Sequence, residues 1–242
     1  GLRWNPKQGG MLLSGNVDGS WVVWDDDKRK LWCKPQMASG VAQKSRVVDL
    51  AWDPLGATCM LVAHECGVVV LWDVEALAEL SVFERQPLGV HALAWLDWAP
   101  GAFVTVNDTT SVAKIWNVSQ KAPLEHVRLA GAGVAMSSVE AAWAGLPKTA
   151  DSGRIHSILP VSRGGAAGRG ASAMFLAFLD GSIGLWNWRH RNLEWRSTAA
   201  HTETIFGCSF SPVDPDVLAT ASYDGGVVVW YTPTMSILSI LH

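Results

Sequence analysis

Short stretches in which apolar and polar residues alternate recur along the chain. Residues 48–52 (VDLAW) and 205–210 (IFGCSF) show this period of two, which is typical of β-strands with one buried face. β-Branched runs that end in tryptophan follow at regular intervals, at Trp24, Trp72, Trp116, Trp186 and Trp230, spaced by 48, 44, 70 and 44 residues. Self-similarity at this period predicts repeated units of four strands, and the longest step is one unit with insertions.

A turn signal lies six residues before each of these tryptophans. It reads Asp18-Gly19, Asp180-Gly181 and Asp224-Gly225 in three units, and Cys66-Gly67 and Thr110-Ser111 in the other two. Asp-Gly between two apolar strands predicts a hairpin, because glycine tolerates positive φ and the aspartate side chain bonds nearby backbone amides.

An aromatic residue lies about 20 positions before four of the tryptophans. Trp4, Trp52 and Phe210 hold an offset of 20 and are followed two residues later by proline, whereas Trp95 lies 21 before Trp116. Proline marks the end of a strand because it has no backbone N–H to donate. Each unit therefore predicts a strand a ending in the aromatic, a strand b before the turn, a strand c ending in tryptophan and a weaker outer strand d, as in residues 78–83, 193–197 and 235–241.

These marks together resemble the WD-repeat family, whose repeats form the blades of β-propellers. The resemblance implies an all-β fold with five four-stranded blades in residues 1–242. A single blade cannot bury both of its faces, and stacking blades around an axis does. Because propellers of this family usually have more blades, we expect the chain to be one part of a larger propeller.

The last unit carries the family's fullest set of structural side chains. The resemblance implies that His201, Asp224, Ser222 and Trp230 form a buried hydrogen-bond chain from the d–a loop to the indole N–H. The reason is physical, since a desolvated carboxylate needs donors and a histidine with turn amides supplies them. Other residues take the position of Ser222 in the other units, so we expect weaker locking of those turns; they are Asn16, His64, Asp108 and Phe178.

Two segments interrupt the repeat. Residues 121–153 are predicted to be a loop insertion with a short helix near 138–144, and the Gly-Ala tract at 162–173 is predicted to be a flexible loop inside the fourth unit.

Composition narrows the class of protein. Net charge is −3, which argues against a dedicated nucleic-acid binder, because phosphate affinity needs a clustered positive field. Four cysteines without a Cys-x-x-Cys pair suit reduced thiols and an intracellular, cytoplasmic setting. No apolar run approaches the roughly 18 residues that a membrane span needs.

The chain shows no arrangement of residues typical of an enzyme. No nucleophile elbow, phosphate-binding loop or dinucleotide fingerprint occurs, and we predict no cofactor and no metal site. His201-x-Glu203 resembles part of a zinc deaminase motif, but no Pro-Cys-x-x-Cys follows. The structural role of His201 is therefore the favoured interpretation.

Function on such a scaffold is expected on its loops, with other proteins or peptides as partners. The predicted contact residues are Glu203, Thr204 and Tyr223 in the last unit and Lys44 and Arg46 in the second. Each of them is also compatible with an ordinary exposed loop position. The alternative is a propeller that binds RNA or phosphoinositides through the basic c–d turns at 28–30 and 189–191. Family members that join propellers to helical repeats occur in transport and ciliary assemblies, so the resemblance implies either setting.

Overall fold

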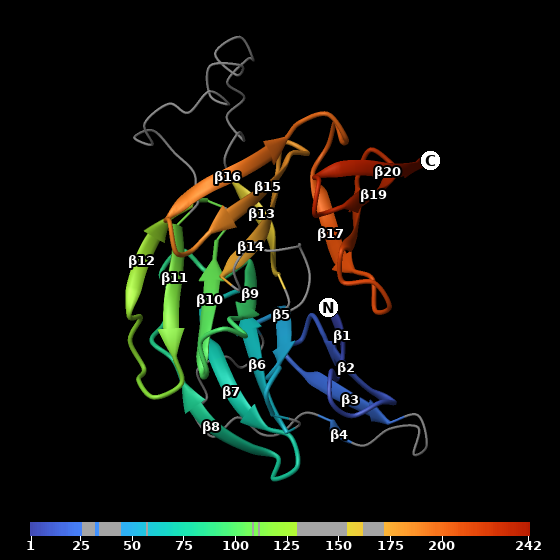
Figure 1. The fold of residues 1–242 in the computed structure, drawn as a ribbon. Helices are drawn as coiled ribbons and strands as arrows, with labels where there is room; N and C mark the ends of the chain where they lie inside the picture. The colour runs from blue at the N-terminus through green and yellow to red at the C-terminus, as the bar shows by residue number, and fades with distance from the viewer. Residues whose placement is uncertain are drawn as a thin grey trace. The chain divides into compact units, whose positions relative to one another are not determined.

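The chain folds into five four-stranded antiparallel sheets, which confirms the predicted all-β propeller class. The structure is a computed structural model, and it describes residues 1–25, 32–33, 45–56, 58–107, 109–110, 112–129, 154–161 and 172–242. In each sheet the strands are neighbours in the order in which they occur in the sequence (Figure 1). We number these sheets blades 1 to 5.

The strands of each blade have the following bounds. Blade 1 contains β1 (Leu2–Trp4), β2 (Met11–Gly15), β3 (Trp21–Asp25) and β4 (Trp32–Cys33), and blade 2 contains β5 (Val47–Trp52), β6 (Cys59–His64), β7 (Val69–Asp73) and β8 (Ala78–Val82). Blade 3 contains β9 (Ala92–Trp95), β10 (Ala102–Val106), β11 (Val112–Asn117) and β12 (Glu125–Arg128). Blade 4 contains β13 (Ile155–Pro160), β14 (Ala173–Phe178), β15 (Ile183–Asn187) and β16 (Asn192–Ser197), and blade 5 contains β17 (Ile205–Phe210), β18 (Val217–Ser222), β19 (Val227–Tyr231) and β20 (Ser236–Leu241).

Two compact units divide the chain. The first comprises Gly1–Asn107 and Ala113–Val127 and holds blades 1, 2 and 3. The second comprises Asp108–Val112 and Arg128–His242 and holds blades 4 and 5. Each unit has its own apolar core.

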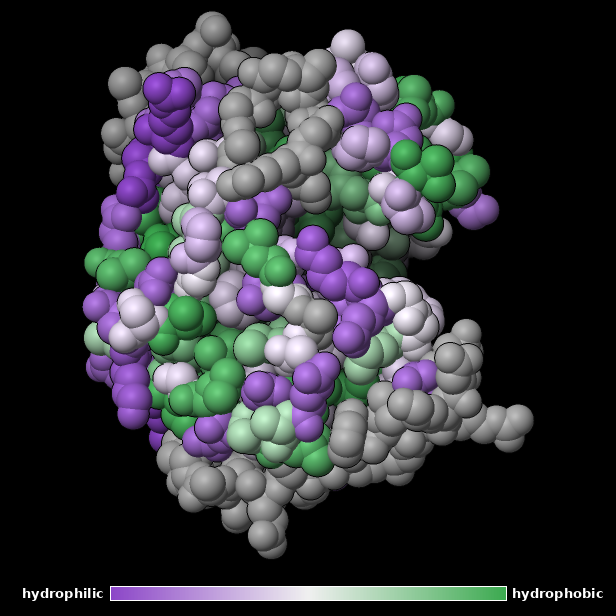
Figure 2. All heavy atoms as spheres, turned by 60° about the horizontal axis from the view of Figure 1, so that its bottom comes forward, coloured by the Kyte–Doolittle hydropathy of each residue, from purple (hydrophilic) through white to green (hydrophobic). Residues whose placement is uncertain are grey.

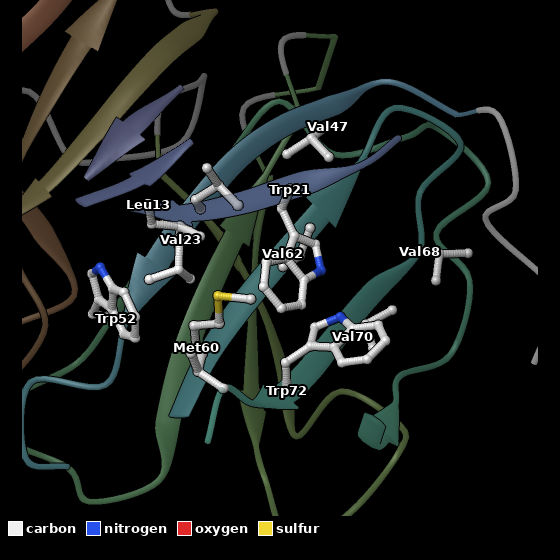
Figure 3. Close-up of a cluster of buried hydrophobic side chains, with 12 residues drawn as sticks. Leu13, Trp21, Val23, Val47, Trp52, Met60, Val62, Val68, Val70 and Trp72 are labelled. Atoms are coloured by element: carbon white, nitrogen blue, oxygen red, sulfur yellow. The ribbon is translucent and has the colours of Figure 1, made fainter. Parts of the chain in front are cut away.

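In the first unit, blades 1 and 2 pack face to face. Leu13, Trp21 and Val23 of blade 1 lie against a row of blade 2 side chains that includes Trp52 and Trp72 (Figure 3). The rings of Trp21 and Trp72 meet edge to face, with centroids 5.4 Å apart. The β-branched runs of the sequence therefore fill the space between blades, as expected for strands buried on both faces.

The opposite face of blade 2 packs on blade 3 in the same way. Leu61, Val69 and Leu71 lie in one cluster with Phe103 and Trp116. The second unit repeats the arrangement, because blade 4 residues around Phe175 and Leu185 form a cluster with Leu218 and Trp230 of blade 5.

Hydrogen bonds join the innermost strands of the first unit. The indole Nε1 of Trp52 donates to the backbone oxygen of Arg3 at 3.1 Å, and the Nε1 of Trp95 donates to the oxygen of Ala51 at 3.1 Å. The buried carboxylate of Asp49 accepts from Arg3 Nη2 at 2.7 Å and from the Leu93 backbone N–H at 3.0 Å. One aspartate on β5 thus links all three blades of this unit.

The predicted insertions need one correction. Glu125–Arg128, which falls inside the predicted loop at 121–153, is strand β12, the outer strand of blade 3. Its sequence, EHVR, has a single apolar residue, so it lacks the alternating pattern that predicts a strand. The suggested helix near 138–144 and most of the Gly-Ala tract lie outside the described residues. Among the described residues, no helix has the length and apolar character that a membrane crossing requires.

Candidate functional site

In blade 5 the loop that precedes β17 (the d–a loop) and the turn between β18 and β19 (the b–c turn) are joined by a chain of side-chain hydrogen bonds. His201 Nδ1 lies 3.1 Å from Asp224 Oδ2, and His201 Nε2 lies 2.9 Å from Thr220 Oγ1. The indole Nε1 of Trp230 donates to the same Thr220 oxygen at 3.0 Å. The histidine, the aspartate and the tryptophan predicted from the sequence are thus brought together.

The hydroxyl in this chain is that of Thr220, so the assignment of Ser222 was wrong. Ser222 instead donates to the backbone oxygen of Glu203 at 2.7 Å. The register explains the difference, because Thr220 pairs with Val228, two residues before Trp230, and lies on the diagonal that a long indole can reach. Ser222 lies one pleat further along the same face, beside the turn.

In the other blades, too, the residue paired with the position two before the blade-end tryptophan decides whether the indole N–H has a hydrogen-bond partner. We call this the diagonal position. It holds a hydroxyl in blades 1 and 3, where Trp24 Nε1 donates to Ser14 Oγ and Trp116 Nε1 donates to Thr105 Oγ1, each at 2.9 Å. Val62 and Leu176 take the position in blades 2 and 4. There, among the described residues, the indole N–H groups of Trp72 and Trp186 are buried without a hydrogen-bond partner.

Blades 3 and 4 use other polar side chains in place of the histidine. In blade 3, Thr105 Oγ1 donates to Gln86 Oε1 at 3.0 Å, so a glutamine continues the chain from the indole. In blade 4, Arg196 on β16 donates to Asp180 Oδ2 at 2.6 Å and to Ser182 Oγ at 2.7 Å. The turn aspartate is therefore locked by an arginine where blade 5 uses a histidine.

Asp224 is held as a carboxylate by the groups around it. Burial disfavours its ionised form, but the backbone amides of Gly226 and Thr202 and the ring of His201 donate to it and outweigh burial. Together they lower the pKa of Asp224 from 3.8 to about 2. The charged form consequently ties the turn to the loop.

An exposed aromatic pair lies where the turn meets β17. Tyr223 is 71% exposed and Phe206, on β17, is 48% exposed, and their ring centroids lie 4.9 Å apart. The backbone N–H of Tyr223 donates to the oxygen of Thr204 at 3.1 Å, which fixes the turn beside β17. Apolar and polar residues are interspersed over the face of the molecule drawn in Figure 2. Because exposed apolar residues are common on protein surfaces, the pairing of the two rings is the more specific feature.

The predicted contact residues differ in how available they are. Glu203, in the d–a loop of blade 5, and Tyr223, in its b–c turn, are exposed. Thr204 is only partly exposed, and its hydroxyl donates to the Leu179 oxygen of blade 4 at 2.6 Å, so its side chain holds the two blades together. Arg46 is exposed beside Glu65, with Nη2 3.3 Å from Oε1, and Lys44 lies outside the described residues.

Sequence reasoning missed Phe206. Its position in the 205–210 strand alternates with buried Ile205, so period two alone places it on an exposed face, but only the register shows that it meets Tyr223. We name Glu203, Phe206 and Tyr223 the blade 5 rim. Within the described part of the chain, no group of three or more His, Cys, Asp or Glu side chains is placed to hold a metal ion.

Comparisons with known proteins connect the chain to one group of relatives. It is 22% identical over 238 residues, 94% of the chain, to "Protein transport protein SEC31" of Kluyveromyces lactis, and 21% identical over 232 residues to "Protein transport protein sec31" of Emericella nidulans. A shorter stretch of 98 residues, 39% of the chain, is 33% identical to "Protein transport protein Sec31A" of Rattus norvegicus. No family model matches the chain.

The similarity is distant and covers a small part of each relative. The chain spans 17% of the Kluyveromyces lactis protein, 16% of the Emericella nidulans protein and 8% of the rat protein. Because the longest alignments run through nearly all of this chain, the likeness concerns the whole set of blades. The chain is therefore a distant relative of SEC31 proteins.

Proposed function

We propose that this chain is a non-catalytic protein-binding platform within a multi-protein assembly and that it binds partners through the blade 5 rim. The observation that carries the proposal is the exposed ring pair formed by Phe206 on β17 and Tyr223 on the b–c turn, which side-chain hydrogen bonds hold to the d–a loop. Aromatic side chains are enriched among residues that dominate binding energy in interfaces. Glu203 adds an exposed carboxylate beside them, which favours partners with a basic group next to an apolar one.

The hydrogen-bond chain beneath the rim supports this role. Asp224 bonds the amides of Thr202 and Gly226, and Ser222 bonds the oxygen of Glu203, so both sides of the rim are fixed before a partner arrives. A rigid binding surface loses less conformational entropy on association than a mobile loop does. The His201–Thr220–Trp230 chain therefore serves binding indirectly, by holding the turn.

The relatives suggest the kind of assembly. Since the matched SEC31 proteins are named as protein transport proteins, we propose that the platform serves a protein-transport assembly in the cytoplasm. A finer resemblance, to WD repeat-containing protein 17 in residues 48–54, 92–119 and 178–230, rests on those sequence stretches alone and is likewise a proposal.

Binding of RNA or phosphoinositides through basic c–d turns is less well supported. In the turn at 189–191, His190 Nδ1 lies 3.4 Å from Glu194 Oε1, and the Arg191 guanidinium lies over the Trp188 ring at 5.7 Å from its centroid. Both side chains thus already have protein neighbours. The second basic turn, at 28–30, lies outside the described residues.

Affinity purification from native lysate at low and high salt tests the proposal. The variant Tyr223→Ala combined with Phe206→Ser is compared with Val213→Ser, a strongly exposed apolar residue in the loop at the other end of β17. Proteins that survive high salt, are lost from the rim variant and are kept by the control support the platform. Nucleic acid or lipid that is released by high salt, with no retained protein, contradicts it.

A further inference from the structure

The edge strand of blade 5 differs from the corresponding strands of the other blades. β20 lies at the end of its sheet and, among the described residues, pairs with β19 alone (Figure 1). All six residues of β20 are exposed, whereas none of the six residues of β16 in blade 4 is. Its sequence, SILSIL, holds four aliphatic side chains and no charge. The edge strands β8, β12 and β16 each contain a glutamate, and β12 and β16 contain an arginine as well.

Such an edge is open to pairing with a further strand. In an antiparallel pair each strand directs alternate backbone N–H and C=O groups away from its neighbour, so β20 presents such groups on the side away from β19. Charged side chains on an edge strand prevent other strands from adding to it, and β20 has none. The backbone and the side chains of this edge therefore both favour strand addition.

The exposure of β20 is a property of the second unit itself. Ile237 and Ile240 lie opposite Trp230 and Val228, which belong to the cluster that blade 5 shares with blade 4. Although blade 4 is in the same compact unit, the two isoleucines remain 38% and 46% exposed. The neighbouring blade thus leaves this edge open.

The register of β20 makes the strand complementary to a second copy of itself. Ile237 and Ile240 lie opposite two positions on the same face of β19, so both share one face of β20. An irregularity that skips Leu238 causes this, because residues three apart lie on opposite faces of a regular strand. In an antiparallel pair, residues directly opposite each other share a face. When two β20 strands pair in this way, Ile237 of each copy meets Ile240 of the other, and Ser236 meets Leu241.

We propose that β20 pairs antiparallel with β20 of a second copy of this chain and so joins the two blade 5 sheets. The pairing satisfies the edge backbone groups, forms two isoleucine pairs and places no like charges opposite each other. It has the two-fold symmetry that is the commonest among homo-oligomers. Two six-residue strands form a small contact, so we expect a dimer that dissociates on dilution. The proposal does not depend on the blade 5 rim, because no rim residue lies on β20.

Disulfide formation in the polypeptide at its natural length tests the register. Ile237→Cys and Ile240→Cys are prepared as separate variants and oxidised mildly, each alone and mixed together. Directly opposite Cα atoms lie about 4.5–5.5 Å apart, within reach of a disulfide. We expect a dimer crosslinked between positions 237 and 240 in the mixture, identified by mass spectrometry of the joined peptides, and little crosslinking of these positions in either variant alone. Crosslinks in the single variants but not in the mixture, or in none of the samples, overturn the proposal.

Sedimentation of the same polypeptide over a wide range of concentrations gives a second readout. Leu238 lies beside the two-fold axis of the proposed pair, so Leu238→Lys brings two ammonium groups together and should weaken the dimer by roughly tenfold or more. Leu80→Lys is the matched control, because the register of β8 skips Leu80 in the same way and the side chain is similarly exposed, at 52% against 57% for Leu238. This control should leave dimerisation unchanged.

Two results of the sedimentation experiment contradict the pairing. A dimer that Leu238→Lys leaves as stable as the parent overturns the proposal. A parent that stays monomeric at every concentration overturns it as well, and protection of the β20 amides from hydrogen exchange in that monomer would assign the edge to another segment of the same polypeptide.

Discussion

Thr220 accepts the indole N–H of Trp230 at 3.0 Å while its oxygen also lies 2.9 Å from His201 Nε2, so one hydroxyl serves two buried groups. The isosteric substitution Thr220→Val leaves the Trp230 indole N–H and His201 Nε2 without this hydroxyl. An unsatisfied buried polar group costs about 1–3 kcal/mol, so we expect a loss of about 2 kcal/mol or more in the free energy of unfolding. Chemical denaturation measures the loss.

The indole resonance of Trp230 separates Thr220 from Ser222. Thr220→Val is expected to shift the Nε1–H signal, whereas Ser222→Ala, which removes a bond to the Glu203 oxygen, leaves it in place. A shift in the Ser222 variant alone would restore the assignment made from the sequence.

Among the described residues the buried indole N–H of Trp72 has no hydrogen-bond partner, and a hydroxyl on the neighbouring strand would supply one. Val62→Thr places a hydroxyl at the diagonal position, where it can accept from Trp72 Nε1 and donate to the Val70 oxygen, as Thr220 donates to Val228 at 3.4 Å. We expect a gain of about 1 kcal/mol in the free energy of unfolding. Val23→Thr, equally buried in the same cluster, is the control and should destabilise, because it adds a hydroxyl without an indole to pair.

Two turn glycines with the same backbone conformation have different surroundings. Gly181 and Gly225 have φ of 80° and 85°. A Cβ on Gly181 would lie 2.7 Å from the Glu203 oxygen and 2.8 Å from the His201 oxygen, whereas a Cβ on Gly225 would lie within 4 Å of no atom in the part of the chain that the structure describes. Gly225→Ala should cost about 1–2 kcal/mol of backbone strain. Gly181→Ala should cost clearly more in the same denaturation experiment, and equal costs would mean that the loop yields freely.

The low pKa of Asp224 links stability to acid pH. Because the folded-state pKa of about 2 lies below the unfolded value near 3.8, the unfolded state takes up this proton first as the pH falls. The contribution of Asp224 is therefore present above pH 3.8 and is lost as the pH falls towards 2. Asp224→Asn should be less stable than the parent at neutral pH and should approach it at the acid end, as judged by denaturation midpoints across this range. A constant difference between the two would argue against the linkage.

Local patterns predicted most of the fold, because each blade is a meander of neighbouring strands. The tryptophan spacing placed strand c, and the alternation before Trp52 and Phe210 placed strand a. Strand β12 was not predicted, because its four residues contain a single apolar side chain and lie after an irregular turn.

The alternation of apolar and polar residues predicted the side-chain contacts of the candidate site less well than it predicted the strands. Thr220 and Ser222 lie two residues apart on one face of β18, so alternation cannot distinguish them, and the choice depends on how far an indole reaches across the register. The Phe206–Tyr223 pair and the Arg3–Asp49–Leu93 links join residues on different strands or blades. No local signal specifies which side chains meet there.

Titration of the purified chain with a partner recovered by affinity purification tests the central claim most directly. Tyr223→Ala should weaken binding by about 2 kcal/mol, roughly thirtyfold in Kd, because it removes the most exposed ring of the rim. Val213→Ser should leave the affinity unchanged. Equal affinity of Tyr223→Ala and the parent chain, with the fold intact by circular dichroism, would contradict the blade 5 rim as the binding surface.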